Sequence, residues 1–134
     1  MWEAYGEVVR KYRHISLKAE RKLIARAQRG SRESRDEIML RHIRFAIFRL
    51  RRKVFYPYLL RYGEDLLSEM IPLLLEKIDS YDLRYRDKDG RPKPVRFSSY
   101  IWKRVDGFII DSMKKIVRTE RMETAMEVEK MPGL

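Results

Sequence analysis

Cysteine is absent from the 134 residues of this chain. Without a thiol there is no disulfide framework, no thiolate zinc site and no cysteine nucleophile, which fits a reducing compartment. The N-terminus lacks the basic-then-apolar pattern of a secretory signal, and no stretch approaches the roughly twenty apolar residues of a membrane span. We therefore expect a cytoplasmic protein with no membrane partner and, at this length, a single domain.

The chain also has little of what enzyme sites are built from. Its two histidines, His14 and His42, lie far apart and have no cysteine partners, so we interpret both as surface or partly packed residues. The six glycines are scattered and form no phosphate-binding loop. Acidic pairs such as Glu64 and Asp65 have no histidine beside them, which favours solvated carboxylates. We predict no catalytic residue, no metal site and no cofactor.

Positive charge is in excess: 31 Lys and Arg stand against 20 Asp and Glu, for a formal net charge of +11. The charge is distributed in blocks. Residues 41–62 hold seven basic side chains and no acid, residues 63–82 hold six acids and one lysine, and residues 83–104 hold eight basic side chains and two acids. A charge run often marks only a solvated face. The alternation favours two partners, in which basic segments meet phosphate and the acidic segment meets a basic protein surface.

Apolar residues recur every three or four positions, so we predict an all-α fold, a compact multi-helix bundle with an N-terminal helical extension. Ser16 and Ser31 are placed to cap helices, and Gly30 is placed to end one. The pattern predicts one helix from 16 to 30, a second from 31 to the stop at Tyr56 and Pro57, and a third across 67–81, which Pro72 is expected to kink.

The rest of the chain predicts a loop and a last helix. Residues 82–94 combine charge with Gly and Pro and are expected to form a mobile polar loop. The last helix should begin at Phe97 or Ser98 and carry an apolar stripe to Met113, with Ile116 in position to continue it. Residues 120–134 could add a short helix that ends in a frayed terminus at 131–134.

The segment 95–104, VRFSSYIWKR, interleaves aromatic rings with Arg and Lys over about two helical turns. Single-stranded nucleic acid needs this combination, because unstacked bases stack on rings and the backbone phosphates need cations. Rings at helical spacing also fit a protein core. The segment by itself leaves both interpretations open.

Four stretches, in order, resemble the polymerase-binding and promoter-melting domain, region 2, of the sigma-70 family of bacterial RNA polymerase sigma factors. They are residues 17–35, 41–45, 64–82 and 96–111. The first is similar to region 1.2, which leads into the domain, and the second to the "Asn-Leu-Arg-Leu" opening of its first core helix, with His42 in place of the asparagine. The third resembles the "Asp-Leu-Ile-Gln-Glu-Gly" helix, and the fourth the "Phe-Ser-Thr-Tyr-Ala" motif of flagellar and stress members.

The resemblance covers about residues 16–115 and implies three parts. Residues 1–30 would be an N-terminal helical segment of the region 1.2 type, residues 31–116 the region 2-like domain, and residues 117–134 a C-terminal tail or short helix. The face that binds the clamp coiled coil of the largest subunit of core RNA polymerase would hold Asp65, Ser68, Glu69 and Leu75.

The resemblance also implies a surface that recognises and melts the promoter −10 element through its single-stranded non-template strand. Tyr100 is expected to stack on an extruded base, while Arg96 and Lys103 hold backbone phosphates. The full expected DNA-binding set is His42, Arg44, Arg96, Phe97, Ser99, Tyr100, Trp102, Lys103 and Arg104.

Departures from the family narrow these expectations. Lys103 and Arg104 stand where housekeeping members carry two tryptophans, which favours an alternative-type factor. Regions 3 and 4, with the reader of the upstream promoter element, have no counterpart, so the chain would be a fragment or a one-domain factor that needs a second protein for that element. Two alternatives stay open. One is a phage- or mobile-element-encoded sigma mimic that binds the polymerase without opening the promoter, and the other is a generic basic helical protein on nucleic acid or anionic membrane.

Overall fold

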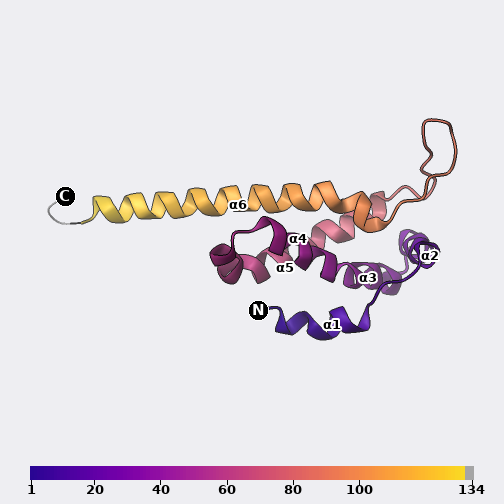
Figure 1. Cartoon of the computed structure of the whole chain (residues 1–134), viewed down its shortest axis with the longest axis horizontal. Coiled ribbons are helices and arrows are strands. Elements are labelled where there is room, and N and C mark those ends of the chain that lie inside the picture. Colours follow the sequence, from indigo (N-terminus) through magenta and orange to yellow (C-terminus); the bar gives the residue numbers. More distant parts are fainter. Residues whose placement is uncertain (132–134) are drawn as a thin grey trace.

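The computed structural model describes residues 1–131, and in that part the chain is all-α, as predicted (Figure 1). The elements are a short 3-10 helix, η1 (Glu3–Tyr5), and the α-helices α1 (Gly6–Lys11), α2 (Leu17–Gln28), α3 (Arg32–Arg41), α4 (Ile43–Lys53), α5 (Tyr56–Ser80) and α6 (Phe97–Glu129). Residues 1–131 contain no strand beyond one isolated bridge between Arg86 and Pro92. None of the helices described is both long and apolar enough to cross a membrane.

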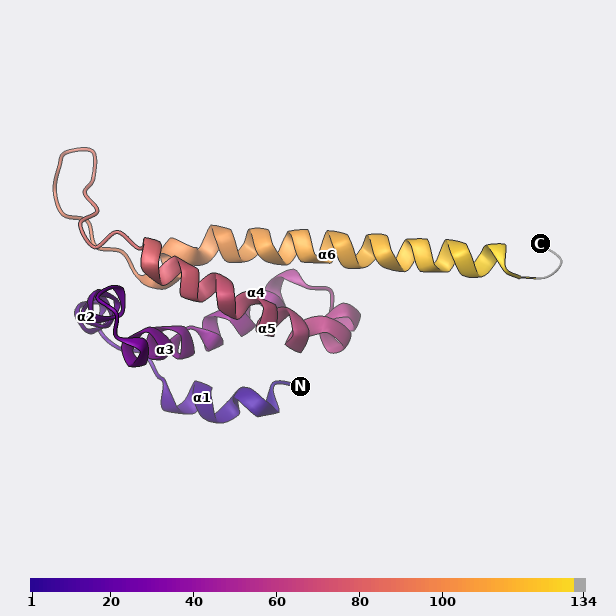
Figure 2. The same ribbon diagram turned by 180° about the vertical axis from the view of Figure 1, so that it is seen from behind.

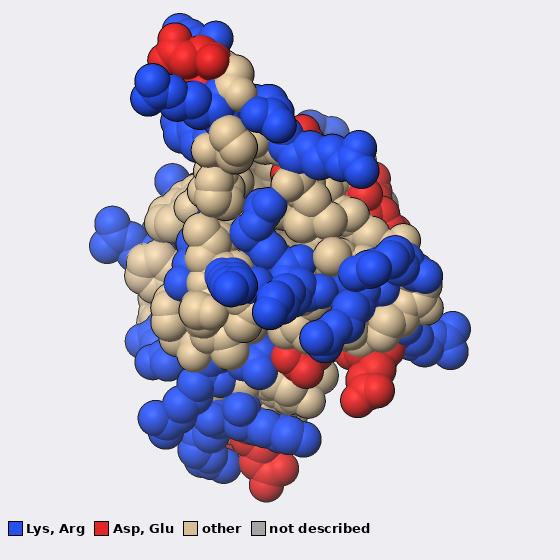
Figure 3. All heavy atoms as spheres, turned by 90° about the vertical axis from the view of Figure 1, so that its right-hand side faces the viewer, with Lys and Arg blue, Asp and Glu red and all other residues tan. Residues whose placement is uncertain are grey.

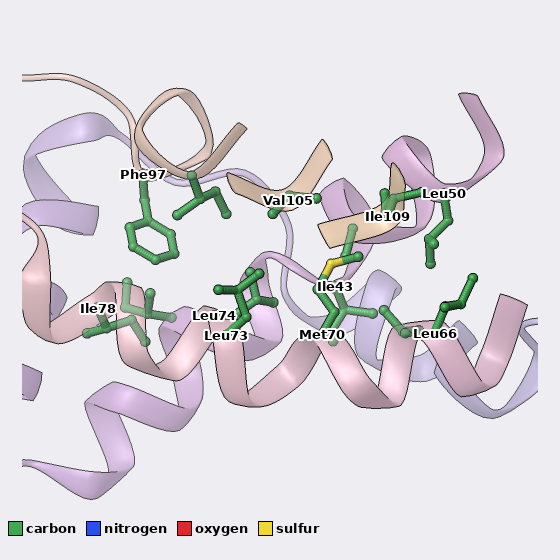
Figure 4. Packing of buried hydrophobic residues seen from close by; sticks show 14 of the residues in the cluster. Ile43, Leu50, Leu66, Met70, Leu73, Leu74, Ile78, Phe97, Val105 and Ile109 are labelled. Carbon is green, nitrogen blue, oxygen red and sulfur yellow. The ribbon is translucent and has the colours of Figure 1, made fainter. Parts of the chain in front are cut away.

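The core lies where α5 and α6 run side by side against α4 (Figure 4). Phe97, Ile101, Val105 and Ile109 recur every fourth residue of α6 and are fully buried. This spacing places the four side chains on one face of the helix, toward α5 and α4. Ile24 of α2 belongs to the same cluster of buried residues, so the helix contributed by residues 1–30 packs into the common core.

The helix signals at the start of the chain are confirmed. Ser16 Oγ accepts a hydrogen bond from Ala19 N at 3.1 Å, and Ser31 Oγ accepts one from Ser34 N at 3.2 Å. Each hydroxyl satisfies one of the amide groups that a helix N-terminus leaves unpaired. Gly30 has a φ of +106°, a left-handed conformation that suits the end of α2 and that other residues rarely adopt.

The predicted single helix from 31 to Tyr56 is wrong, because the structure breaks it at His42 into α3 and α4. The His42 imidazole donates from Nδ1 to the carbonyl oxygen of Ile38 at 2.7 Å. The backbone N–H of His42 bonds to the carbonyl of Met39 instead, three residues back. The side chain therefore takes the place of one α-helical hydrogen bond at the junction of α3 and α4.

The two prolines of α5 behave differently. Pro57 lies in the first turn, where its missing N–H costs nothing, so the predicted stop at Tyr56 and Pro57 is also the start of the next helix. Pro72 lies inside α5, and the helix continues through it to Ser80. The third helix is therefore longer than the 67–81 stretch predicted.

α6 is one continuous helix of 33 residues, where the sequence predicted a helix to about Ile116 and a separate short one (Figures 1 and 2). No glycine or proline interrupts residues 108–131, so nothing in the chain stops the helix. Tyr58 and Tyr62 of α5 donate hydrogen bonds to the Glu120 carboxylate. These bonds hold α6 against α5 as far as Glu120. Residues 121–131 are exposed. The predicted frayed end, apart from Met131, lies outside the described residues.

The segment 82–94 projects from the end of α5 as a hydrogen-bonded hairpin (Figure 2). Asp87 N bonds to the Arg91 carbonyl at 2.9 Å, and Lys93 N bonds to the Tyr85 carbonyl at 3.0 Å. Gly90, at a φ of +76°, makes the turn. The loop that the composition predicted therefore has a defined shape.

Candidate nucleic-acid interface

Glu20 of α2 positions the start of α6, where the aromatic and basic segment begins. The side chain is 5% exposed, and its Oε2 accepts a hydrogen bond from Phe97 N at 3.0 Å. Its Oε1 lies 3.4 Å from His42 Nε2. The His42 ring meets the Phe97 ring edge to face, with 4.8 Å between centroids. A carboxylate at a helix N-terminus satisfies an unpaired amide and complements the helix dipole.

The charge state of Glu20 follows from these contacts. Burial raises the pKa of Glu20, but the hydrogen bonds from His42 and from Phe97 N, with the charges of His42 and Arg96, outweigh burial and lower the pKa below its usual value. The carboxylate form is the one that can cap α6. The hydrogen bond from Phe97 N to the Glu20 carboxylate therefore joins α2, in the N-terminal part of the chain, to the start of α6.

Two residues expected to contact DNA are buried, and this corrects the prediction. His42 is 6% exposed, and its two ring nitrogens face Ile38 and Glu20, so it has no free nitrogen for a ligand. Phe97 is 0% exposed and packs in the core. The order of residues matched the motif, but helical periodicity turns Phe97 inward with Ile101. Both residues position the interface.

Arg96, the residue before α6, is engaged within the protein. Its Nη1 donates to the Ile15 carbonyl at 2.7 Å, and its Nη2 donates to His14 Nε2 at 3.0 Å. These bonds hold the 12–16 connection against the start of α6. Arg96 can therefore meet a phosphate only if it gives up or shares one of these partners.

Tyr100 lines a hollow of about 340 Å³ between α6 and the hairpin. Its hydroxyl donates to the Ser80 carbonyl at 2.9 Å, which fixes the ring against the end of α5. Tyr81 meets it edge to face with 5.4 Å between centroids. The hollow is lined by Tyr81, Asp82, Tyr85, Lys93, Val95, Ser99 and Tyr100.

Sequence reasoning missed Tyr85, which the hairpin contributes to this hollow together with the basic residue Lys93. Tyr85 is 48% exposed. The signal was present, since Tyr85 stands between Arg84 and Arg86 in the sequence, and 95–104 likewise places rings beside basic residues. The loop prediction treated this stretch only as a source of charge. The lining combines three tyrosine rings with one lysine, one serine, one valine and one acid, Asp82. The rings suit a planar base, and the lysine suits a neighbouring phosphate.

Trp102 is held by a buried ion pair. Arg49 of α4 and Asp106 of α6 form a bidentate pair, with 2.9 Å from Nε to Oδ1 and 2.7 Å from Nη2 to Oδ2. The Arg49 guanidinium lies 4.3 Å from the centroid of the Trp102 ring, and the Phe45 ring meets that indole edge to face. The hydrogen bonds from Arg49 lower the pKa of Asp106 and outweigh its burial. Trp102 keeps 40% of its surface exposed.

The remaining expected DNA-binding residues are exposed: Arg44, Ser99, Lys103 and Arg104. A second hollow, of about 500 Å³, lies between the 12–15 connection, α4 and the start of α6. Its charged lining is Arg13, Glu20, Arg41, Arg44 and Arg96. Figure 3 looks onto this end of the molecule and shows Lys and Arg spread across the face, with few acids among them.

The basic block 41–62 divides in the folded chain. Arg41 pairs with Glu37 and donates to the Arg13 carbonyl, Arg49 pairs with Asp106, and the exposed Arg61 lies 3.5 Å from the Glu120 carboxylate, so three of its seven basic residues already have partners. The exposed cations of the block are Arg44, Arg51, Arg52, Lys53 and Arg61.

The acidic face expected to bind polymerase lies on α5. Asp65, Ser68 and Glu69 are exposed and lie at spacings of three and four residues, hence on one side of the helix, while Leu75 is half-buried. Asp65 and Glu69 also edge a hollow of about 320 Å³ whose other wall includes Lys115 of α6. Asp79, further along α5, is paired with Arg35 at 2.6 Å.

Within residues 1–131, no three His, Asp or Glu side chains gather in a way that could hold a metal ion. Comparisons of the chain with protein-family models, with curated proteins and with solved structures find no significant match.

Proposed function

We propose that the chain is a sigma-type transcription-initiation module, which binds core RNA polymerase through α5 and the non-template strand of the melted promoter −10 element through the start of α6. The observation that carries the proposal is the hollow of about 340 Å³ whose lining includes Tyr81, Tyr85 and Tyr100 together with Lys93. An extruded base could stack on the Tyr100 ring there, and the adjacent backbone phosphates could bind Lys103 and Arg104.

The energetics of strand capture favour this site. Taking a base out of a duplex costs a few kcal/mol, and stacking on a protein ring returns about 1 to 3 kcal/mol per base. The Tyr100 ring is already fixed by its bond to Ser80, so little side-chain freedom is lost on binding. Lys103 and Arg104 follow on the exposed side of α6, one turn further on.

The acidic face supports the polymerase half of the proposal. Asp65 and Glu69 project from α5, away from its buried leucines, and present two carboxylates within one helical turn. A basic, partly apolar surface on the polymerase would complement them, with Leu75 at the apolar end. This arrangement gives the two basic blocks and the acidic block separate partners.

Strand binding is tested with the protein in complex with core polymerase, by comparing its affinity for single-stranded and duplex promoter fragments at two salt concentrations. Tyr100→Ala should weaken single-strand binding about 5- to 150-fold, which corresponds to the stacking of one base. Tyr100→Phe keeps the ring and should stay near wild type. Tyr56→Ala, which removes an exposed ring far from the hollow, is the matched control. Equal affinity for both DNA forms, or equal loss in both alanine variants, contradicts the strand site.

Polymerase binding is tested by co-elution of the chain with core enzyme. The double variant Asp65→Lys with Glu69→Lys should abolish the complex. Glu123→Lys with Glu127→Lys makes the same change in charge on the exposed end of α6 and should leave it intact. Full binding by the α5 variant would refute the docking assignment.

A second candidate is a sigma mimic, encoded by a phage or mobile element, that occupies the polymerase without opening DNA. It is favoured by the bonds of Arg96 to His14 and Ile15 and by the Arg49 guanidinium over Trp102, which leave fewer groups for a strand. In vitro transcription with core enzyme separates the two, run with and without a candidate protein that reads the upstream element. Promoter-dependent transcripts support the initiation module, and inhibition without transcripts supports the mimic.

A further inference from the structure

A hollow of about 660 Å³ lies between the N-terminal helices and α4, outside the tyrosine hollow of the proposed strand site. One wall comes from η1 and α1 and its connections, and the other from α4. The lining residues are Trp2, Tyr5, Gly6, Val9, Arg44, Ile47, Phe48, Arg51 and Arg52. None of them is acidic, so the groove pairs an apolar, aromatic wall with a wall of three arginines.

The arginine wall is aligned by helix geometry. Arg51 and Arg52 follow Arg44 by seven and eight residues, which places the three on one side of α4 within about 12 Å along the axis. All three are exposed. The salt bridges found within residues 1–131 use Arg41 and Arg49 of this basic block and also Arg61, but not these three. Guanidinium groups bind phosphate oxygens with two parallel hydrogen bonds, so the wall suits a ligand with several phosphates.

Both walls of the groove offer flat apolar surface. Trp2 and Tyr5 are half-buried, and Phe48, on α4 itself, is 48% exposed between Arg44 and Arg51. Trp2 is held in place by its contact with Gly63 of α5 and by the bond of its backbone N–H to Glu64. Fixed aromatic rings next to cations are the surroundings in which a nucleobase stacks. The volume lies within the range of small-molecule sites, about 300 to 1,000 Å³.

We propose that this groove binds a free nucleotide carrying two or more phosphates. The base lies against the rings of Trp2 and Phe48, and the phosphates lie on Arg44, Arg51 and Arg52. The proposal goes beyond strand capture at α6 and does not depend on it. Arg44 and Phe48 also line the neighbouring hollow toward Arg96, so a nucleic-acid strand is the competing occupant, and the test includes it.

The experiment measures fluorescence anisotropy of ribose-labelled ATP and GTP with the full chain. Competitors are unlabelled ATP and GTP, the monophosphates, inorganic pyrophosphate and a ten-nucleotide oligo-dT. Unlabelled triphosphate should displace the label better than monophosphate or pyrophosphate. Arg51→Gln with Arg52→Gln should lower affinity by at least about tenfold, because both phosphate contacts are lost. Arg118→Gln with Arg121→Gln removes the same charge from exposed positions of α6 and should stay within about twofold of wild type.

A second variant tests the aromatic surface that Phe48 contributes to the groove. Phe48→Leu should reduce the preference for triphosphate over pyrophosphate, since it removes a stacking surface and leaves the arginines in place. Circular dichroism melts confirm that each variant is folded. Three outcomes overturn the proposal: no saturable binding at millimolar nucleotide, equal loss in the two arginine double variants, or displacement of the label by oligo-dT but not by unlabelled triphosphate. The last would assign the groove to a strand.

Discussion

At the scale of single residues, Glu20 links three parts of the chain that are distant in sequence. Its carboxylate caps α6 at Phe97 N and faces His42, the residue at which α3 gives way to α4. These contacts are buried, so their energies are less screened by water than those of surface pairs. The start of α6, and with it the candidate strand site, depends on one charged group of α2.

The variant Glu20→Gln should destabilise the fold by about 2 kcal/mol at neutral pH, because it keeps an oxygen for Phe97 N but loses the charge facing His42. The folded-state pKa of Glu20 lies below its ordinary value of 4.5. Its carboxylate therefore stabilises the fold above that value, and the contribution is lost as pH falls through the folded pKa. Denaturant titrations between about pH 6 and about pH 3 should show the difference between wild type and variant shrinking as pH falls. A difference that stays constant with pH would contradict the assignment.

The ion pair between Arg49 and Asp106 joins α4 to α6. The two side chains are 8% and 17% exposed. Asp106→Ala leaves the Arg49 guanidinium without its carboxylate partner and should lower the free energy of unfolding by about 3 kcal/mol. The double variant Arg49→Met with Asp106→Leu removes both charges and should recover most of that loss. Denaturant unfolding measures the energies. A double variant as unstable as Asp106→Ala would show that the cost comes from packing.

At the scale of elements, helix breaks and close approaches set the shape. α5 and α6 are long because few residues interrupt them, whereas α3 and α4 meet at His42 through a side-chain bond to Ile38. Gly63 is the close approach on α5. A Cβ there would lie 3.2 Å from both Leu59 Cδ1 and Trp2 Cη2, closer than ordinary van der Waals contact. Because Gly63 has no side chain, the Trp2 indole can pack directly against the backbone of α5.

Gly63→Val should release the N-terminal segment, because the added methyl groups occupy the space of the indole. In a Trp102→Phe background, the emission of Trp2 should shift to longer wavelength, and the segment 1–15 should become more sensitive to protease. Gly107→Ala is the matched control, since nothing lies within 4 Å of its Cβ position in α6. It should raise stability by about 1 kcal/mol through helix propensity. An unchanged Trp2 emission in Gly63→Val would refute the contact.

At the scale of the whole molecule, the chain is a helical body from which α6 continues as a rod (Figure 1). Glu120 is the last fixed point, with bonds from the hydroxyls of Tyr58 and Tyr62 at 3.0 and 2.9 Å. Arg61 lies 3.5 Å from the same carboxylate. The tyrosine hollow and the loop lie at the opposite end of α6, so the rod and the candidate strand site are well separated.

The hydrogen bond to Glu120 raises the pKa of Tyr58 and of Tyr62 above their ordinary value of 10.0. A raised folded pKa means that the contacts stabilise the fold below that value and are lost as pH rises through the folded pKa. In Glu120→Gln, absorbance titration should show two tyrosines ionising at lower pH than in wild type. Hydrogen exchange should increase in residues 110–125. Identical titration curves would show that the tyrosines do not hold α6.

Sequence patterns served well where the physics is local. Capping by Ser16 and Ser31, the turn at Gly30 and the stop before Pro57 depend on neighbours within a few residues, and all were predictable. The break at His42 was not, because it depends on the Ile38 carbonyl and on Glu20 from another helix. The candidate site divides in the same way: the aromatic and basic segment was predictable, while the burial of Phe97 and the contribution of Tyr85 were not.

The sequence alone determined the fold class, the separation of charge into blocks and the placement of rings with cations in 95–104, because helical periodicity and composition are properties of the chain itself. The tertiary structure decided which charges are available. Arg49 and Arg96 have internal partners, whereas Arg44, Arg51 and Arg52 line a groove. The reason is that a charged side chain takes its partner from whatever the fold brings within a few ångströms, and these partners lie up to 82 residues away in the sequence.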